Sequence, residues 1–143
     1  MSLKGRVALI TGAAKGIGKA TALALASDGA DIVVNYYKSK KEAAHLAKEI
    51  EHLGRKILLI PANVTEPKAV AKMLHRAERK FRKIDILVNN VGNFVIKPLS
   101  EMSYAEWNDI IQSNLYAAFL CCQAALPGMR IRKWGRIINL GVA

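Results

Sequence analysis

The sequence predicts a doubly wound α/β domain, in which helices cover both faces of a parallel sheet. Five short apolar runs recur along the chain, and stretches with helical periodicity separate them. The runs are nearly continuous rather than alternating, which is typical of parallel strands buried on both faces. The chain has 143 residues and a hydrophobic fraction of 52%, enough for one domain with a core. We therefore interpret residues 1–143 as a single unit.

The five predicted strands are Arg6–Thr11, Asp31–Tyr36, Lys56–Ile60, Asp85–Asn90 and Arg136–Leu140. A helix-length segment separates each pair, so the chain alternates strand and helix with right-handed crossovers. A complete dinucleotide-binding fold of this type has about six strands. We therefore expect a sheet that is truncated after the fifth strand, and a domain that is incomplete at its C-terminus.

The segments between the strands carry helix signals. The first helix is expected from about Gly16 to Asp28, with Gly29 as its left-handed cap. A serine followed three residues later by a glutamate predicts a capping box at the start of two later helices, with the pairs Ser39 and Glu42, and Ser103 and Glu106. A further helix follows Thr65, and the last helical region reaches Pro127 or slightly beyond.

A glycine-rich loop, "TGAAKGIG", joins the first strand to the first helix. Gly12 allows a sharp turn at the strand end, Gly16 allows a ligand to approach the backbone, and Gly18 allows the helix to pack against the sheet. The free N–H groups at the helix start, around Ile17, and the helix dipole favour a bound pyrophosphate. The loop therefore predicts a dinucleotide site.

Two other phosphate-binding patterns do not fit this loop. The ATP-type loop needs glycine and Ser or Thr where this chain has Ala13 and Ala20. The common G-x-G-x-x-G spacing is also absent, because the glycines here follow G-x-x-x-G-x-G. The strand before the loop and the helix after it nevertheless favour dinucleotide binding.

Three motifs together resemble the short-chain dehydrogenase/reductases: T-G-x-x-x-G-x-G after the first strand, "NNVG" after the fourth (Asn89–Gly92), and Trp107 followed by "SNLY". The resemblance covers essentially the whole chain. It implies a Rossmann fold and an oxidoreductase that moves a hydride between nicotinamide and a small-molecule carbonyl or alcohol. It also implies a homo-oligomer, a dimer or tetramer, in which Leu115, Phe119 and Leu126 belong either to the interface or to the core.

The end of the second strand indicates which cofactor is bound. NAD-binding folds usually place Asp or Glu there for the ribose, whereas this chain has Asn35, Tyr36 and Tyr37. This strand end therefore has no carboxylate that would repel the 2′-phosphate of NADP(H), and the lysines Lys15 and Lys38 can attract that phosphate. We therefore expect NADP(H) rather than NAD(H), with Tyr36 in the site. The alternative for Lys38 is a solvated loop lysine.

The resemblance assigns further cofactor contacts at the ends of the third and fourth strands. Asn63 and Val64 match the family's adenine contact, which is usually Asp-Val. Asn90, Val91 and Gly92 are expected to line the cofactor, with Val91 in place of the usual alanine. The alternative for the last three is a capped strand end followed by a turn.

In the resembled family a tyrosine acts as acid or base, a lysine four residues later lowers its pKa, and a serine and an asparagine assist. Asn114 matches the asparagine; the alternative is an ordinary helix residue. Two Tyr-x-x-x-Lys spacings begin at Tyr36 and Tyr37, but both lie at the adenosine end. Val142 occupies the serine position. We expect the chain alone to be inactive, and the alternative is a non-catalytic dinucleotide-binding or regulatory protein.

The formal net charge of +11 favours an anionic partner, such as a nucleotide, a nucleic acid, an acidic carrier protein or a phospholipid surface, or else reflects a solvated basic surface. Aromatic residues make up only 6% and no recognition helix is evident, so we expect no nucleic-acid partner. We also expect no membrane partner, since no apolar run is long enough to cross a bilayer. The adjacent Cys121 and Cys122 indicate a reduced, cytoplasmic protein without a metal site.

Overall fold

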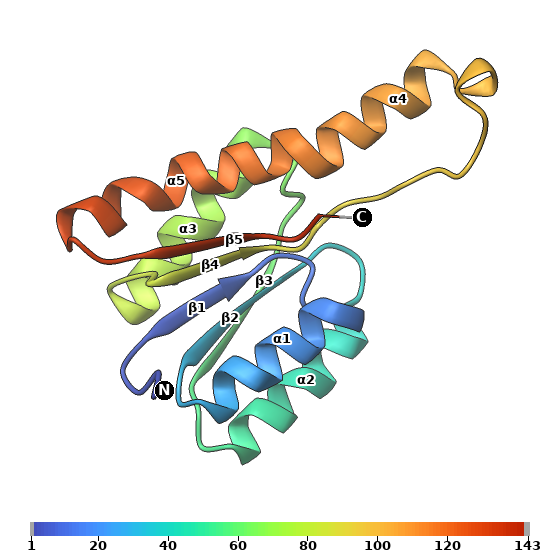
Figure 1. Ribbon diagram of the computed structural model, residues 1–143. Helices are drawn as coiled ribbons and strands as arrows, with labels where there is room; N and C mark the ends of the chain where they lie inside the picture. Colours follow the sequence, from blue (N-terminus) through green and yellow to red (C-terminus); the bar gives the residue numbers. More distant parts are fainter. Residues whose placement is uncertain (1, 142–143) are drawn as a thin grey trace.

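The computed structural model describes residues 2–141 and contains one parallel sheet with the strand order β3-β2-β1-β4-β5 (Figure 1). The strands are β1 (Val7–Ile10), β2 (Asp31–Tyr36), β3 (Ile57–Pro61), β4 (Ile86–Asn89) and β5 (Arg136–Asn139). The chain begins in the middle of the sheet, moves outward to β3, and then crosses over to β4. The predicted doubly wound sheet is confirmed, with its switch point between β1 and β4.

Helices cover both faces of this sheet. On one face lie α1 (Gly16–Ser27) and α2 (Lys40–His52). On the other lie α3 (Pro67–Phe81) and α5 (Ala117–Ile131). Before α5 come the 3-10 turn η1 (Leu99–Glu101), the helix α4 (Tyr104–Ile111) and the π-helical turn η2 (Gln112–Tyr116). Figure 1 shows that α4 continues the line of α5 and projects beyond the sheet.

Successive strand residues point into two separate cores. On β1, Leu9 packs with α3 and α5, whereas Ile10 packs with α1 and α2, and both are fully buried. On β2, Val33 and Val34 divide in the same way. Because side chains alternate between the two faces of a strand, a sheet covered on both faces needs apolar residues at every position. This explains why the strand sequences are continuous apolar runs.

The two predicted capping boxes have different outcomes. At α4 the box is present: the Glu106 N–H donates to Ser103 Oγ at 3.2 Å, and the Ser103 N–H donates to Glu106 Oε2 at 2.8 Å. At α2 the prediction is wrong, because the Ser39 side chain makes no capping hydrogen bond. Ser39 has ψ 58°, away from the extended value that a capping residue adopts, and the Lys40 N–H bonds to the Lys38 carbonyl in a tight turn.

The long C-terminal helical region is interrupted, which the sequence did not indicate. Residues 112–116 adopt a π-helical turn between α4 and α5. The helix then continues past Pro127, which lies inside α5, and ends at Ile131. Single π turns within α-helices are frequent at functional sites. Among residues 2–141, no helix has both the length and the apolar character needed to span a membrane.

Candidate functional site

The candidate site lies at the carboxyl edge of the sheet, where the glycine loop after β1 meets the ends of β2 and β4. Asn35, at the end of β2, is 1% exposed and fixes this loop. Its Oδ1 accepts the Gly12 N–H at 3.2 Å, its carbonyl accepts the Ala13 N–H at 2.9 Å, and its Nδ2 donates to the Ala62 carbonyl at 3.0 Å. Asn35 therefore holds the ends of three strands together, and its side chain points inward.

Asn90, which follows β4, supports the loop from the other side. Its Nδ2 donates to the carbonyls of Thr11 and Gly12 at 3.0 and 3.1 Å, and its N–H donates to Thr11 Oγ1 at 2.9 Å. A Cβ added to Gly18 would lie 2.6 Å from Asn90 Nδ2 and 2.8 Å from the Gly12 carbonyl oxygen. Only glycine at position 18 lets α1 approach the sheet this closely, which agrees with the packing role predicted for it.

The first turn of α1 offers unused backbone donors. Among residues 2–141, no acceptor bonds the N–H groups of Gly16, Ile17 and Gly18. Within the described part of the chain no side chain caps this end of the helix, and its first turn contains no acidic residue. Gly16 has φ 57°, and a Cβ added there would meet nothing within 4 Å, so the space over the loop is open. This helix start is thus able to receive an anion.

At the end of β2, the predicted site residue Tyr36 lies in the core rather than at the open edge. The Tyr36 ring is only 8% exposed and packs in the core with α1 and α2, so it does not face the open edge. The next residue, Tyr37, is 62% exposed, and Lys38 Nζ lies 5.4 Å from its ring centroid. Tyr36 and Tyr37 are adjacent residues of the same type, and the sequence alone does not show which of the two side chains faces the open edge.

The basic side chains expected at this end are available. Lys15 and Lys38 are both exposed, and neither forms an ion pair within the described part of the chain. Lys15 immediately precedes α1, and Lys38 follows β2, so both flank the open carboxyl edge.

At the end of β3, the two side chains predicted to contact adenine, Asn63 and Val64, make contacts with the turn and the helix that follow them. Asn63 Oδ1 accepts hydrogen bonds from the Thr65 N–H at 3.1 Å and the Thr65 hydroxyl at 2.9 Å, and its Nδ2 donates to Glu66 Oε1 at 3.0 Å. Val64 is buried under α3. The Asn63 amide therefore stabilises the turn into α3.

At the other end of the site, Asn114 lies in the π turn and faces the loop after β4. Its Nδ2 donates to the carbonyl of Asn93 at 2.7 Å and to that of Ile110 at 3.0 Å. A Cβ added to Gly92 would overlap Asn114 Oδ1, so a side chain at position 92 would displace the Asn114 amide. Val91 Cγ2 lies 3.0 Å from a Cβ added to Gly12, which places Val91 against the glycine loop. The structure thus brings residues 90–92 between the helix start and Asn114.

Asn93 is a residue of this site that sequence reasoning missed. Its Oδ1 lies 2.5 Å from Ser113 Oγ, its Nδ2 donates to Asp109 Oδ2, and its carbonyl accepts from Asn114. It therefore joins the loop after β4 to α4, through Asp109, and to the π turn, through Ser113 and Asn114. No signal in the sequence marks it, since it lies one residue beyond "NNVG" and its partners are 16 or more residues away.

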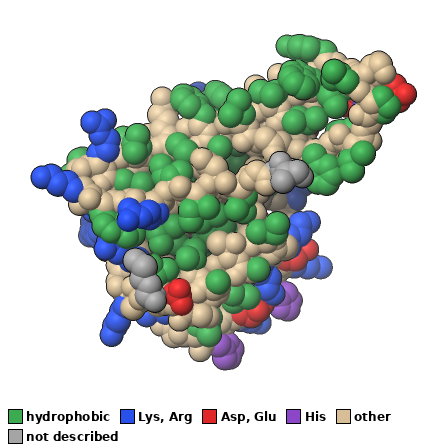
Figure 2. Space-filling model, viewed as in Figure 1, with side chains coloured by type: hydrophobic (Ala, Val, Ile, Leu, Met, Phe, Trp, Pro, Cys, Tyr) green, Lys and Arg blue, Asp and Glu red, His purple; other side chains and the backbone are tan. Residues whose placement is uncertain are grey.

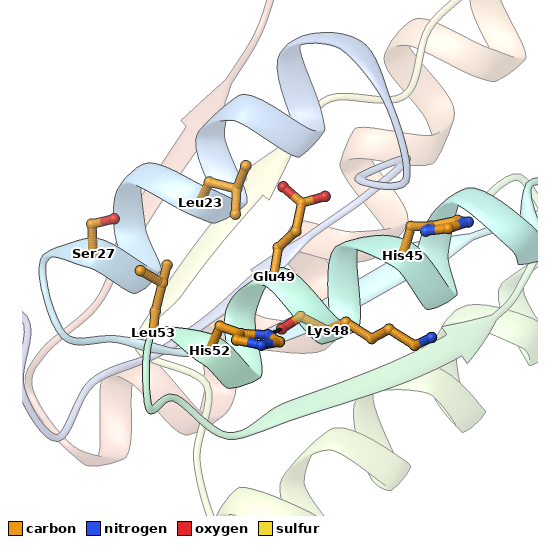
Figure 3. Close-up of a pocket in the computed structure, with 7 residues that line it drawn as sticks. All are labelled: Leu23, Ser27, His45, Lys48, Glu49, His52 and Leu53. Carbon is orange, nitrogen blue, oxygen red and sulfur yellow. Dashed lines mark hydrogen bonds between the residues drawn. The ribbon is translucent and has the colours of Figure 1, made fainter.

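A separate cleft of about 580 Å³ lies between α1 and α2 (Figure 3). It is lined by Leu23, Ser27, His45, Lys48, Glu49, His52 and Leu53. Ser27 ends α1 and Leu53 follows α2, so this cleft reaches toward the edge of the sheet opposite the glycine loop. Among residues 2–141, no group of three or more His, Cys, Asp or Glu side chains is arranged to hold a metal. The cleft is not part of the candidate site.

The parallel sheet, its switch point and the uncapped start of α1 define a Rossmann-type nucleotide-binding fold. The sequence profile described as short chain dehydrogenase matches residues 6–143. The chain belongs to the short-chain dehydrogenase family.

Known relatives agree with this assignment. The chain is 42% identical over 139 residues to a 3-oxoacyl-(acyl-carrier-protein) reductase of Synechocystis, with 97% of this chain and 56% of that protein covered. It is 41% identical over 133 residues to a protein of the same name from Staphylococcus aureus strain Mu50, with 93% and 54% covered. The chain thus spans about half the length of the curated relatives it matches.

Solved structures also match over the described sheet. A short-chain dehydrogenase/reductase variant from Serratia marcescens superimposes with a TM-score of 0.93 at 31% identity, covering 100% of this chain and 58% of that one. A short-chain type dehydrogenase/reductase from Mycobacterium marinum gives 0.91 at 37% identity, covering 96% and 56%.

Proposed function

We propose that residues 1–143 form the NAD(P)-binding domain of an NADP(H)-dependent oxidoreductase that acts on a carbonyl or alcohol substrate. The observation that carries this proposal is the start of α1, where among residues 2–141 no side chain caps the helix and the first N–H groups are unbonded. The space beside Gly16 in the glycine loop is open to a ligand. A diphosphate is an anion of suitable size and charge for these donors. The nicotinamide of a bound cofactor supplies or accepts the hydride.

The residues of the chain divide this task between them. Gly16 and Ile17 offer free backbone N–H groups to the diphosphate, Gly12 makes the turn of the loop, and Asn35 and Asn90 keep the loop rigid. Residues 90–92 line the path toward Asn114. Rigid positioning of this kind lowers the ordering cost of binding.

The preference for NADP(H) over NAD(H) is assigned to Lys15 and Lys38. Both are exposed and without ion-pair partners among residues 2–141, so a 2′-phosphate would meet two unpaired ammonium groups. A charge-assisted hydrogen bond contributes about 1.5–3 kcal/mol, or roughly 10- to 100-fold in affinity. We assign Tyr37 as the ring beside the adenosine end.

The test of this assignment is a titration of the Lys15→Ala variant with NADPH and with NADH. We expect the affinity for NADPH to fall by roughly 10- to 100-fold, with a much smaller change for NADH. Lys4→Ala, another exposed lysine, is the control and should leave both affinities unchanged. Equal losses for the two cofactors with Lys15→Ala would contradict the assignment.

For the chemical step, we propose that Asn114 helps to relay a proton and that Asn93 holds its amide in place. The tyrosine and lysine that the family uses have no counterpart at this end of the site in the sequence, and Val142, at the expected serine position, lies outside the described residues. We propose that the 143-residue chain alone does not turn over substrate. The names of the curated relatives support a 3-oxoacyl thioester as the substrate of a longer protein.

Val142 favours a second candidate function, a dinucleotide-binding protein without turnover, because valine has no hydroxyl with which to orient a substrate. The two functions differ in one assay. The full translation product of the gene is mixed with NADPH and a 3-oxoacyl thioester. Oxidation of NADPH supports the enzyme, and tight binding without oxidation supports the binding protein.

We also propose that α4 and α5 contribute to a homo-oligomer, a dimer or tetramer. Leu115, Phe119 and Leu126 are exposed rather than part of the core, with Leu115 65% exposed. Figure 2 shows hydrophobic side chains gathered along the side of the molecule formed by these helices. Light scattering of Phe119→Glu should show a smaller species than the wild type.

The free thiols of Cys121 and Cys122 support a reduced, cytoplasmic setting.

A further inference from the structure

The outer face of α3 carries a row of basic side chains. These are Lys68, Lys72, Arg76, Arg79 and Lys80, all exposed. Spacings of three and four residues place them on one side of the helix, over about 18 Å of its length. Among residues 2–141 none of them takes part in an ion pair or donates a side-chain hydrogen bond. Five unpaired cations in one row make this face the natural contact for an anionic partner.

The strand β3 lies beside this row and has an open edge. Among residues 2–141 it is the last strand of the sheet, and β2 is the only strand with which it pairs. The Ile32 N–H bonds to the Lys56 carbonyl and the Ala62 N–H to the Tyr36 carbonyl, each at 2.9 Å. Even-numbered residues of β3 therefore bond toward β2. The N–H and C=O groups of Ile57 and Leu59 consequently point to the free edge.

Two hollows connect the open edge to the basic row. One, of about 290 Å³, lies between Leu58 on β3 and the side chains of Arg76, Arg79 and Lys80. The other, of about 190 Å³, is lined by Ile60, Pro61, Ala62, Ala69, Lys72, Met73 and Arg76. Arg76 lines both, so the hollows adjoin one another along α3. Each combines apolar groups from the strand with cations from the helix.

We propose that this surface, defined here as the α3–β3 groove, binds an extended acidic segment of a partner protein as an added strand. The segment's backbone would bond to Ile57 and Leu59, and its carboxylates would face Arg76 and Arg79. Strand addition gives affinity through main-chain hydrogen bonds and specificity through alternate side chains. The groove uses none of the residues assigned to the dinucleotide.

The chemistry of the groove favours a protein segment over the other anions. A sugar–phosphate backbone has no peptide groups to pair with β3, and it offers no small apolar side chain for the hollow beside Leu58. A bilayer presents a surface that cannot enter a recess between a strand and a helix. A second copy of this edge would bring another basic row against the first, and like charges repel. Pro61 lacks an N–H, so strand pairing ends there and the segment is short.

The probe is a fluorescein-labelled octapeptide that alternates glutamate with valine, titrated against the whole 143-residue chain by fluorescence anisotropy. We expect binding that weakens by about tenfold in the variant Arg76→Glu/Arg79→Glu, because two attractions become repulsions. The matched control is Lys4→Glu/Arg130→Glu, which changes the net charge equally at exposed residues elsewhere and should bind as the wild type does. Circular dichroism verifies folding, and Arg76→Gln/Arg79→Gln replaces the first variant if it does not fold.

Two further peptides test the mode of binding. A peptide with glutamine in place of glutamate should not bind, which would show that binding depends on the carboxylates. N-methylation of alternate backbone nitrogens, in the two possible registers, should abolish binding in one register, which assigns strand pairing. The proposal is overturned if both methylated peptides bind like the parent, if a single-stranded oligonucleotide of equal charge binds as tightly, or if the two charge variants lose affinity equally. Absence of binding at millimolar peptide also overturns it, and the basic row then serves only to protect the strand edge from pairing.

Discussion

Gly18 is the position where the structure predicts the sharpest response to a single added methyl group. In Gly18→Ala the new Cβ would lie 2.6 Å from Asn90 Nδ2, 2.8 Å from the Gly12 carbonyl oxygen and 2.9 Å from the Ala13 Cα. Two of these three neighbours are backbone atoms, which cannot rotate away. The loop or the helix must therefore shift.

The expected cost follows from two opposing effects. Forcing an extra methyl group into a packed site costs about 1–3 kcal/mol, whereas replacing glycine by alanine inside a helix returns about 0.5–1 kcal/mol. Since the contacts are with rigid atoms, we expect a net loss of about 1–2 kcal/mol in the free energy of unfolding. For a domain of this size the melting temperature should fall by roughly 2–8 °C.

Urea unfolding followed by circular dichroism measures this loss. The matched control is Gly128→Ala in α5, where the added Cβ would meet only the ends of flexible side chains, Arg132 Nη1 at 3.0 Å and Glu78 Oε1 at 3.2 Å. We expect this control to be as stable as the wild type or slightly more stable. If Gly18→Ala is no less stable than the wild type, or if both variants lose the same free energy, the packing described for the glycine loop is wrong.

Three further predictions concern other parts of the molecule. Hydrogen bonds from Lys97 and Ser103 lower the pKa of Glu106 from 4.5 to about 2. The ionised Glu106 carboxylate therefore stabilises the fold fully above pH 4.5, and this contribution is lost as the pH falls toward 2. In urea titrations, the difference in unfolding free energy between the wild type and Glu106→Gln should vanish as the pH is lowered over this window. Asn93→Ala should speed amide hydrogen exchange at residues 112–116 and leave the exchange rates in α1 unchanged. Unchanged exchange at residues 112–116 would contradict the role of Asn93 in holding the π turn. Ile138 is 44% exposed on the edge strand β5, so Ile138→Lys should reduce self-association in light scattering, and a wild type that is monomeric at high concentration would refute this.

Most of the fold could be predicted because local patterns and tertiary structure agree. The continuous apolar runs required cover on both faces, and both faces of the sheet are covered. Gly12 and Gly16 have positive φ values, and Gly18 has no room for a side chain, as turn and packing arguments indicate. Backbone geometry at glycine is a local property, and a single sequence is sufficient to detect it.

The missed features depend on contacts between distant residues. Tyr36 turns into the core and Asn35 binds the loop after β1, because the direction of a side chain at a strand end depends on where the strand pairs. The π turn around Asn114 coincides with its bonds to Asn93, 21 residues earlier. Ser39 had the residue type for a cap, but a tight turn removed the backbone geometry that a cap needs. None of these contacts has a local sequence signal.

The most direct test of the central claim is calorimetric titration of the folded chain with NADPH. The free N–H groups at the start of α1 predict saturable binding of one NADPH per chain. They also predict that Gly16→Asp, which puts a carboxylate at the same helix end, removes this binding while the sheet stays folded. A folded wild-type chain that releases no heat with millimolar NADPH would contradict the account.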